Sequence, residues 1–305
     1  MATTVGRLAT PPNPPSSLAA SLVRLLRPRQ WVKNVLVFSA PGAAGVLTHG
    51  DELWASVVAF VAFCLAASGT YCLNDAADAE HDRFHPVKRH RPVANGAVAV
   101  EAARGIGVAL VLGGILLGFL TGRWQLPAVT AGYVALTTSY TVWLKNVAVV
   151  DIAVVATGFV VRALAGAAAT GVRVSDWFII VASFGSLFMV AGKRSAELAG
   201  DQAVQTRAVL ASYSPQFLTY VRSVASGVAV LAYCLWAFEK AHLAGDGFPW
   251  FQLSIIPFVL AILRYALRLD QGDGGAPEDV VLGDRTLQVL GLLWAVVFGI
   301  GVYAG

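Results

Sequence analysis

The chain has 305 residues, of which 57% are hydrophobic and only 13% are charged, and its formal net charge is +4. Soluble domains carry about 25% charged residues, so this composition excludes an ordinary soluble protein and indicates an all-α, polytopic membrane protein. The small positive charge suits anionic lipids or phosphorylated substrates, and the sequence contains no nucleic-acid-binding module.

The first 20 residues are rich in Pro, Thr, Ser and Ala and contain no apolar core followed by a signal-peptide cleavage site. We expect a disordered tail over residues 1–20 and a single transmembrane domain over residues 21–305. Apolar stretches long enough to cross a bilayer, at about 20 residues each, predict nine helices. These stretches lie near residues 31–48, 53–73, 104–122, 125–143, 148–170, 177–192, 217–238, 250–268 and 286–304.

The Lys and Arg positions predict the orientation, because short cytoplasmic loops retain positive charge. With a cytoplasmic N-terminus, only Arg123, Arg173 and Lys240 lie outside, and Arg162 falls within the fifth span. An arginine within a span is costly unless it is paired or hydrated, so Arg162 is a candidate functional residue. The cytoplasmic polar loops are then expected near residues 74–98, 144–150, 192–216 and 269–285.

The first polar segment, residues 27–34, reads Arg-Pro-Arg-Gln-Trp-Val-Lys-Asn and combines basic groups with an interfacial Trp. Two interpretations stay open for it: binding of a lipid phosphate, or anchoring of the first helix at the headgroups.

Four oxygen-bearing side chains, Asn74, Asp75, Asp78 and Asp82, follow the second apolar stretch. On an α-helix they fall within an arc of about 100°. Like charges at this spacing repel, so a divalent cation is the simplest favourable partner, and oxygen ligands point to Mg²⁺ or Mn²⁺. The alternative is a solvated acidic helix end.

A basic segment comes directly after this acidic motif, at residues 85–92, with the sequence His-Pro-Val-Lys-Arg-His-Arg-Pro. A metal-bridged diphosphate carries more negative charge than the metal neutralises, so it requires neighbouring cations such as Lys88, Arg89 and Arg91. The alternative is ordinary positive charge in a cytoplasmic loop.

The fourth loop is bracketed by Tyr140, Lys145 and Asp151. A snorkelling lysine and a helix-capping aspartate would explain the last two without any ligand.

A second polar segment follows the sixth span, where Lys193, Glu197 and Asp201 share one helical face and Arg194 precedes Glu197 by three residues. This face suits either a second metal and phosphate site or a chain of helical salt bridges.

The acidic motif resembles the first signature of the UbiA superfamily of intramembrane transferases, Asn-Asp-x-x-Asp-x-x-x-Asp after the second span. The resemblance covers nearly the whole chain and implies a nine-helix bundle. Residues 27–34, 85–92 and 184–194 are similar to one branch, the decaprenyl-phosphate phosphoribosyltransferases of actinobacterial cell-wall synthesis. One departure concerns the second motif, which is usually Asp-x-x-x-Asp and is Glu197-x-x-x-Asp201 here.

The resemblance implies transfer of 5-phosphoribose from phosphoribosyl diphosphate to decaprenyl phosphate, which gives a precursor of the arabinose donor for cell-wall arabinan. It implies Mg²⁺, or Mn²⁺, on Asn74, Asp75, Asp78 and Asp82, the three aspartates being catalytic. Donor phosphates would be bound by Lys88, Arg89, Arg91, Tyr140, Lys145, Lys193 and Arg194. The acceptor phosphate would be bound by Arg29, Gln30, Lys33 and Asn34.

The implied location is the plasma membrane of an actinobacterium, with the active site facing the cytoplasm. A prenyltransferase of the same superfamily, with a prenyl diphosphate donor and an aromatic acceptor, is the alternative function. A transporter fits less well, because nearly all charge lies at one interface rather than near the midplane. Prenyl chain length, anomeric outcome, metal number and homo-oligomer formation are left open.

Overall fold

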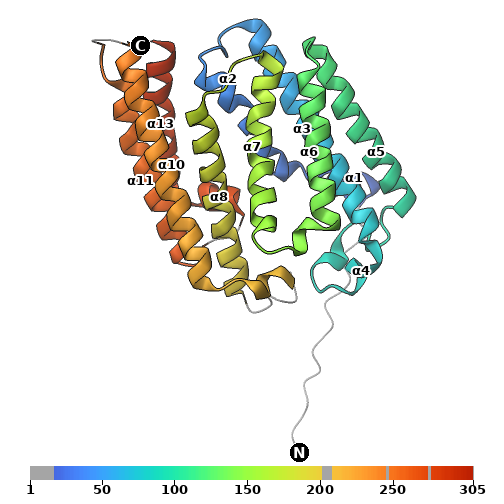
Figure 1. The fold of residues 1–305 in the computed structure, drawn as a ribbon. Coiled ribbons are helices and arrows are strands. Elements are labelled where there is room, and N and C mark those ends of the chain that lie inside the picture. Colours follow the sequence, from blue (N-terminus) through green and yellow to red (C-terminus); the bar gives the residue numbers. More distant parts are fainter. Residues whose placement is uncertain (1–16, 201–207, 245–246, 274–275, 305) are drawn as a thin grey trace, which may run out of the picture.

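The computed structural model describes residues 17–200, 208–244, 247–273 and 276–304, and within these ranges the chain forms helices and no strands (Figure 1). Seven helical segments of this described part are long and apolar enough to cross a membrane. They are α3 (Gly50–Ala77), α5 (Val100–Leu117) with η3 (Gly118–Thr121), α7 (Val150–Thr170), α8 (Asp176–Ala199), α10 (Pro215–Ala244), α11 (Trp250–Asp270) and α13 (Arg285–Tyr303).

Two of the nine expected spans are not among these seven segments. Residues 125–143 form α6 (Gln125–Val142), which runs beside α7. The expectation of one helix over residues 31–48 is wrong, because the chain forms η1 (Pro28–Phe38), a 3₁₀-helix, and a short α2 (Ser39–Ala43). Pro41, inside this stretch, lacks the N–H that a continuous helix needs.

The first helix begins before the boundary that the sequence predicts for the transmembrane domain. Residues 1–16 lie outside the described part, but α1 (Leu18–Leu26) already begins within the segment expected to be disordered. The Ser17 hydroxyl accepts a hydrogen bond from the Ala20 amide at 3.3 Å and so caps this helix. Helix α1 ends at Leu26, and the next residue, Arg27, has a left-handed backbone with φ 53°.

Helices α3 and α5 cross at small residues. A Cβ added at Gly69 would lie 2.7 Å from the Gly107 carbonyl oxygen, and one added at Gly114 would lie 2.7 Å from the Ala62 carbonyl oxygen. The two backbones therefore approach as closely as only glycine permits, which is a packing mode typical of membrane helices. Ala79, Val93 and Val98, from the segment between the two helices, pack with Cys72 and Ala76 at the end of α3.

The segment η1 is held against α3 and α7. The Trp31 indole N–H donates to the Ser68 hydroxyl at 3.0 Å, and that hydroxyl donates to the Leu26 carbonyl at 2.8 Å. On the other side, a Cβ at Gly166 of α7 would clash with the Val37 carbonyl. One side of the 3₁₀ segment is therefore packed against the bundle, with Asn34 and Val37 buried.

The polar connections gather at one end of the bundle (Figure 1). This end carries α4 (Ala79–Phe84), η2 (Lys88–His90), the α6–α7 turn with η4 (Leu144–Asn146), and η5 (Ala208–Ser212) beyond α8. Helix α12 (Pro277–Gly283) links α11 to α13 and contacts α8. The acidic motif therefore lies at the same end as the second polar segment.

Candidate active site

The acidic motif forms a bent turn rather than one continuous helix. Helix α3 ends at Ala77, and Asp78 joins it to α4 with φ −90° and ψ 2°. The expectation of a single helical face over residues 74–82 is therefore wrong at this bend. The Asp78 amide still donates to the Asn74 carbonyl and the Asp82 amide to the Asp78 carbonyl, each at 2.9 Å, so the four residues remain on one compact turn.

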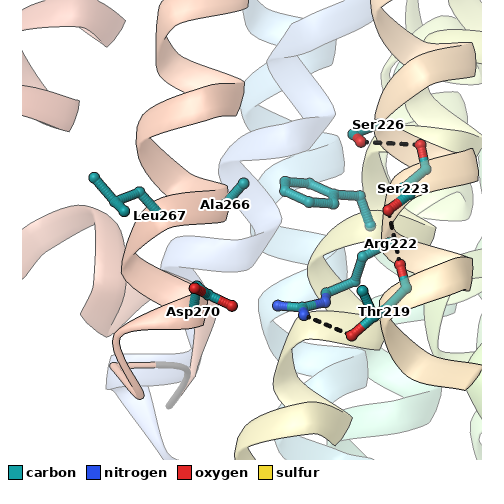
Figure 2. Close-up of a pocket in the computed structure, with 8 residues that line it drawn as sticks. Thr219, Arg222, Ser223, Ser226, Ala266, Leu267 and Asp270 are labelled. Atoms are coloured by element: carbon teal, nitrogen blue, oxygen red, sulfur yellow. Dashed lines mark hydrogen bonds between the residues drawn. The ribbon is translucent and has the colours of Figure 1, made fainter. Parts of the chain in front are cut away.

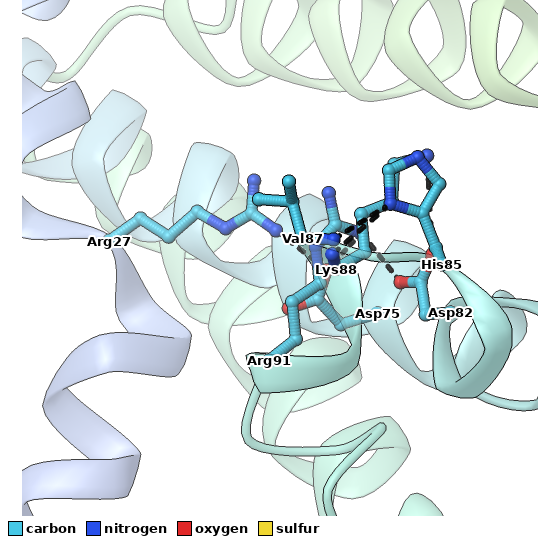
Figure 3. Close-up of polar contacts among 7 residues, drawn as sticks. All are labelled: Arg27, Asp75, Asp82, His85, Val87, Lys88 and Arg91. Atoms are coloured by element: carbon cyan, nitrogen blue, oxygen red, sulfur yellow. Dashed lines mark hydrogen bonds and ion pairs between the residues drawn. The ribbon is translucent and has the colours of Figure 1, made fainter. Parts of the chain in front are cut away.

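Two carboxylates of this turn are buried and held by arginines (Figure 3). Arg91 Nη1 lies 3.1 Å from Asp75 Oδ1 and 2.8 Å from Asp82 Oδ2, and Arg27 Nη2 lies 2.6 Å from Asp75 Oδ1. The Lys88 ammonium is 4.0 Å from Asp82. Buried carboxylates need such compensation, because an unpaired charge away from water is strongly disfavoured. No local sequence pattern indicated Arg27 as a partner of Asp75.

His85 shapes the basic segment. Its Nδ1 accepts hydrogen bonds from the Val87 and Lys88 amides, at 3.2 and 3.3 Å. This turn directs the Lys88 ammonium to Asp82 (Figure 3). Arg89 is exposed, and its Nε donates to the neighbouring His90 ring at 3.4 Å. Lys88 and Arg91 thus face the acidic turn, whereas the Arg89 side chain is directed to His90.

The acidic turn fits a divalent cation by its chemistry. Within the described residues no three acidic, His or Cys side chains already form a metal cluster. However, Arg91 Nη1 lies within hydrogen-bond distance of both Asp75 and Asp82, so these two carboxylates are close enough to share one cation. The half-buried Asn74 and Asp78 side chains lie on the same turn and add oxygen donors, which are the ligands that Mg²⁺ prefers.

The second polar segment is built around Arg194, which is almost completely buried. Its Nε donates to Asp151 at 2.8 Å, its Nη1 to Glu197 at 2.7 Å and its Nη2 to the Tyr140 hydroxyl at 3.1 Å. The Tyr213 hydroxyl donates to the other oxygen of Asp151. Burial and this hydrogen bond raise the pKa of Tyr213, so the hydroxyl stays protonated as a donor.

This network places Asp151 as an ion-pair partner, a role beyond the helix cap that its sequence position indicates. The Lys193 ammonium is 3.9 Å from Glu197. The half-buried Lys145 lies in η4, and Asp201 lies outside the described residues. Salt bridges of the kind expected from the helical spacing are therefore present, and a second metal site on this face stays a prediction.

The η1 residues predicted to bind the acceptor phosphate divide into two groups. The Lys33 ammonium is 2.6 Å from Gln30 Oε1 and 3.2 Å from Glu278 of α12, while the exposed Arg29 lies 3.9 Å from Asp279. Asn34, by contrast, is buried. Nothing in the local sequence around α12 indicated that its carboxylates would reach η1.

Asn34 is part of the environment that accommodates Arg162. Arg162 Nε donates to Asn34 Oδ1 at 2.9 Å, Nη2 to the Tyr133 hydroxyl at 2.7 Å and Nη1 to the Gly158 carbonyl at 2.6 Å. The guanidinium also lies 4.7 Å from the centre of the Tyr133 ring. Within the described residues Arg162 is thus paired with neutral acceptors and an aromatic face, and the Asn34 amide donates to Cys64 Sγ at 3.3 Å.

A transmembrane helical bundle with a buried carboxylate turn and flanking cations at one end defines an intramembrane transferase class. The model of the UbiA prenyltransferase family matches residues 35–290, and this chain belongs to that family. It is 45% identical over 295 residues to decaprenyl-phosphate phosphoribosyltransferase of Corynebacterium glutamicum, covering 95% of this chain and 89% of the relative. The Mycobacterium tuberculosis protein of that name is 46% identical over 302 residues, covering 96% and 97%.

A solved structure agrees on the fold. A UbiA homologue from Archaeoglobus fulgidus bound to GPP and Mg²⁺ matches with a TM-score of 0.67 over 92% of this chain and 99% of that chain. The sequence identity is 16%, so this likeness concerns the fold alone.

Proposed function

We propose that this chain transfers the 5-phosphoribosyl group of phosphoribosyl diphosphate to decaprenyl phosphate and releases diphosphate. The observation that carries the proposal is the near full-length identity of 45–46% to two decaprenyl-phosphate phosphoribosyltransferases. The site supports it, because buried carboxylates surrounded by basic groups suit a charged diphosphate leaving group.

The acidic turn is proposed to bind the diphosphate end of the donor through Mg²⁺, with Mn²⁺ as an alternative. Asn74, Asp75, Asp78 and Asp82 would hold the ion, which neutralises charge on the leaving diphosphate when bound. Arg91 bridges Asp75 and Asp82 in this structure and would have to move to a donor phosphate. Lys88 is already directed to this turn and would remain beside the diphosphate.

The second polar segment is proposed to bind the remaining donor phosphate. Lys193, with Lys145 and the exposed Arg89, would approach it, while Tyr140 and Glu197 keep the Arg194 guanidinium oriented. Arg194 itself is almost fully buried and neutralised by Asp151 and Glu197, so its contribution to phosphate binding requires exchange of one carboxylate for a phosphate.

The acceptor phosphate is proposed to lie near Lys33, Gln30 and Arg29 of η1. In the transfer step an oxygen of this phosphate forms a bond to ribose C1, while the bond from C1 to the diphosphate oxygen breaks. A phosphate monoester is anionic near neutral pH, so the attack needs no protein base. Asn34 stays among the predicted acceptor-site residues, but its amide contacts Arg162 and Cys64 in this structure.

The membrane arrangement completes the proposal. We infer nine crossings, the seven long segments together with α6 and the η1–α2 segment, and a cytoplasmic N-terminus in the plasma membrane of an actinobacterium. The soluble donor would then enter from the cytoplasm and the polyprenyl tail from the bilayer. The product would supply arabinose-donor synthesis for the cell wall.

A donor-competition assay tests this function. The purified protein receives decaprenyl phosphate, an aromatic prenyl acceptor, and equal amounts of phosphoribosyl diphosphate and a prenyl diphosphate, with Mg²⁺. Mass analysis of the extracted lipid should show decaprenyl phosphate enlarged by one phosphoribosyl unit and no prenylated aromatic product. A prenylated aromatic product in place of the phosphoribosyl lipid would assign the chain to prenyl transfer instead.

A further inference from the structure

A pocket of about 300 Å³ lies between α8, α10 and α11 (Figure 2). Its walls carry the Arg222 guanidinium, the Thr219 and Ser223 hydroxyls and the Asp270 carboxylate, together with apolar carbon from Phe188 and Leu267. None of these residues takes part in the transfer proposed above.

Arg222, the cation of this pocket, does not use all of its hydrogen-bond donors within the protein. Arg222 Nε is buried and has no hydrogen-bond partner among the described residues, while Nη2 donates to the Thr219 hydroxyl at 3.1 Å. Native proteins leave few buried polar groups without a partner, so this guanidinium N–H beside the pocket is available to donate to a ligand there. An oxyanion would accept from Nε and Nη together, in the paired geometry that guanidinium groups favour.

An anionic side chain lies across the same pocket. Figure 2 shows Asp270 and Arg222 pointing toward each other from opposite walls, and the described residues contain no ion pair between them or to either one. The neighbouring Arg268 is paired with Asp273 and Asp284 instead. The pocket therefore presents a cation and an anion that are separated by open space, which suits a zwitterion.

The pocket borders the apolar outer surface of the bundle. Leu267, which lines it, is 46% exposed, and Leu263 one turn earlier on α11 is 60% exposed. Arg222 is the eighth residue of α10, which places it about 10 Å along the axis from Pro215, toward the end of the bundle that carries the polar connections (Figure 1). A ligand with an apolar tail can reach this pocket from the bilayer.

We propose that this pocket binds the headgroup of an aminophospholipid, a phosphate diester with a primary ammonium of the phosphatidylethanolamine class. The phosphate accepts from Arg222 and Thr219, the ammonium donates to Asp270, and the glycerol and first acyl carbons contact Leu267 and Phe188. A phosphatidylglycerol would leave Asp270 unpaired beside the phosphate, and a choline headgroup has no N–H to donate to it.

Native mass spectrometry of the delipidated full chain tests the proposal, with ethanolamine, glycerol and choline phospholipids of identical acyl chains. The wild-type protein should retain the ethanolamine lipid preferentially. Arg222→Gln should lower its retention about tenfold, the loss expected for one charge-assisted hydrogen bond. Asp270→Asn, at an exposed position where folding is not at risk, should abolish the preference for ethanolamine over glycerol. Arg285→Gln, an exposed arginine at the start of α13, is the matched control and should change neither.

Two soluble competitors distinguish binding of a lipid from binding of a soluble headgroup or phosphate. Glycerophosphoethanolamine and inorganic phosphate, at the lipid concentration, should not displace the bound ethanolamine lipid, because neither has the acyl carbon that contacts Leu267. Displacement by either would overturn the assignment of a lipid. Equal retention of the three lipids by the wild type, or unchanged retention by Arg222→Gln and Asp270→Asn, would overturn the headgroup assignment. None of these readouts depends on transfer activity.

Discussion

Arg194 and Asp151 share one buried ion pair, yet Arg194→Gln is expected to destabilise the protein more than Asp151→Asn. In Arg194→Gln, the fully buried Asp151 carboxylate keeps only the Tyr213 hydroxyl as a strong donor among the described residues. Removing one partner of a buried pair costs about 3–5 kcal/mol, because the other charge stays buried and uncompensated.

In Asp151→Asn the situation differs, because Arg194 still donates to Glu197 at 2.7 Å and to Tyr140 at 3.1 Å. The loss is then close to one charge-assisted hydrogen bond, about 1.5–3 kcal/mol. The two substitutions should therefore differ by roughly 2 kcal/mol in the free energy of unfolding, from the two ranges above.

The assay is thermal unfolding in one detergent at pH 7, followed by tryptophan fluorescence. Arg194→Gln should have the lower midpoint. The double variant should be less destabilised than the sum of the single changes, because a neutral amide in place of the Asp151 carboxylate needs no cation. Lys193→Gln, a half-exposed neighbour, is the control and should stay near the wild-type midpoint. Equal midpoints, or a lower one for Asp151→Asn, would refute this account of the network.

Three further predictions concern other parts of the chain. Lys33→Gln should raise the KM for decaprenyl phosphate and leave the KM for the donor unchanged in steady-state kinetics; a change confined to the donor would remove Lys33 from the acceptor site. Asn34→Ala should destabilise the fold by about 1–3 kcal/mol in the same unfolding assay, because it deprives the buried Arg162 of an acceptor, and an unchanged midpoint would contradict this. Hydrogen bonds from Arg264 and the Leu287 amide hold the pKa of Asp284 below its ordinary value, so its contribution to stability is present above about pH 4 and lost as the pH falls through the lowered pKa. Asp284→Asn should flatten the acid limb of the stability profile, and an unchanged limb would contradict this assignment.

The sequence was most informative where a pattern is local. Spacing and composition were enough to recognise the acidic motif, the basic segment after it and the long apolar stretches. The bounds of α3, α7 and α13 follow those stretches closely. The bend at Asp78 was not predicted, because helical periodicity continues through the motif and says nothing about where hydrogen bonding is interrupted.

The partners of the polar residues were the least predictable part. Arg27 contacts Asp75 across 48 residues of sequence, and Arg162 contacts Asn34 across 128. Such contacts arise from the crossing of helices, which no local pattern encodes. The 3₁₀ conformation of η1 was missed for a similar reason, because it depends on packing against Gly166 as well as on Pro41.

Asp78 offers the most direct test of the central claim, that this acidic turn supports metal-dependent ribosyl transfer. Its side chain makes no ion pair within the described residues, so Asp78→Asn removes the negative charge of a proposed ligand without breaking the arginine bridges of Asp75 and Asp82. The measurement is the mass of decaprenyl phosphate extracted after incubation with phosphoribosyl diphosphate, in Mg²⁺ or in EDTA.

The wild type and the control Glu80→Gln, exposed on the same turn, should yield the phosphoribosyl lipid in Mg²⁺ and none in EDTA. Asp78→Asn should reduce the rate of product formation at least about 100-fold while keeping the wild-type unfolding midpoint, as expected when charge stabilisation of the leaving group is lost. Near-wild-type turnover by Asp78→Asn, or no phosphoribosyl lipid from folded wild-type protein, would contradict the claim.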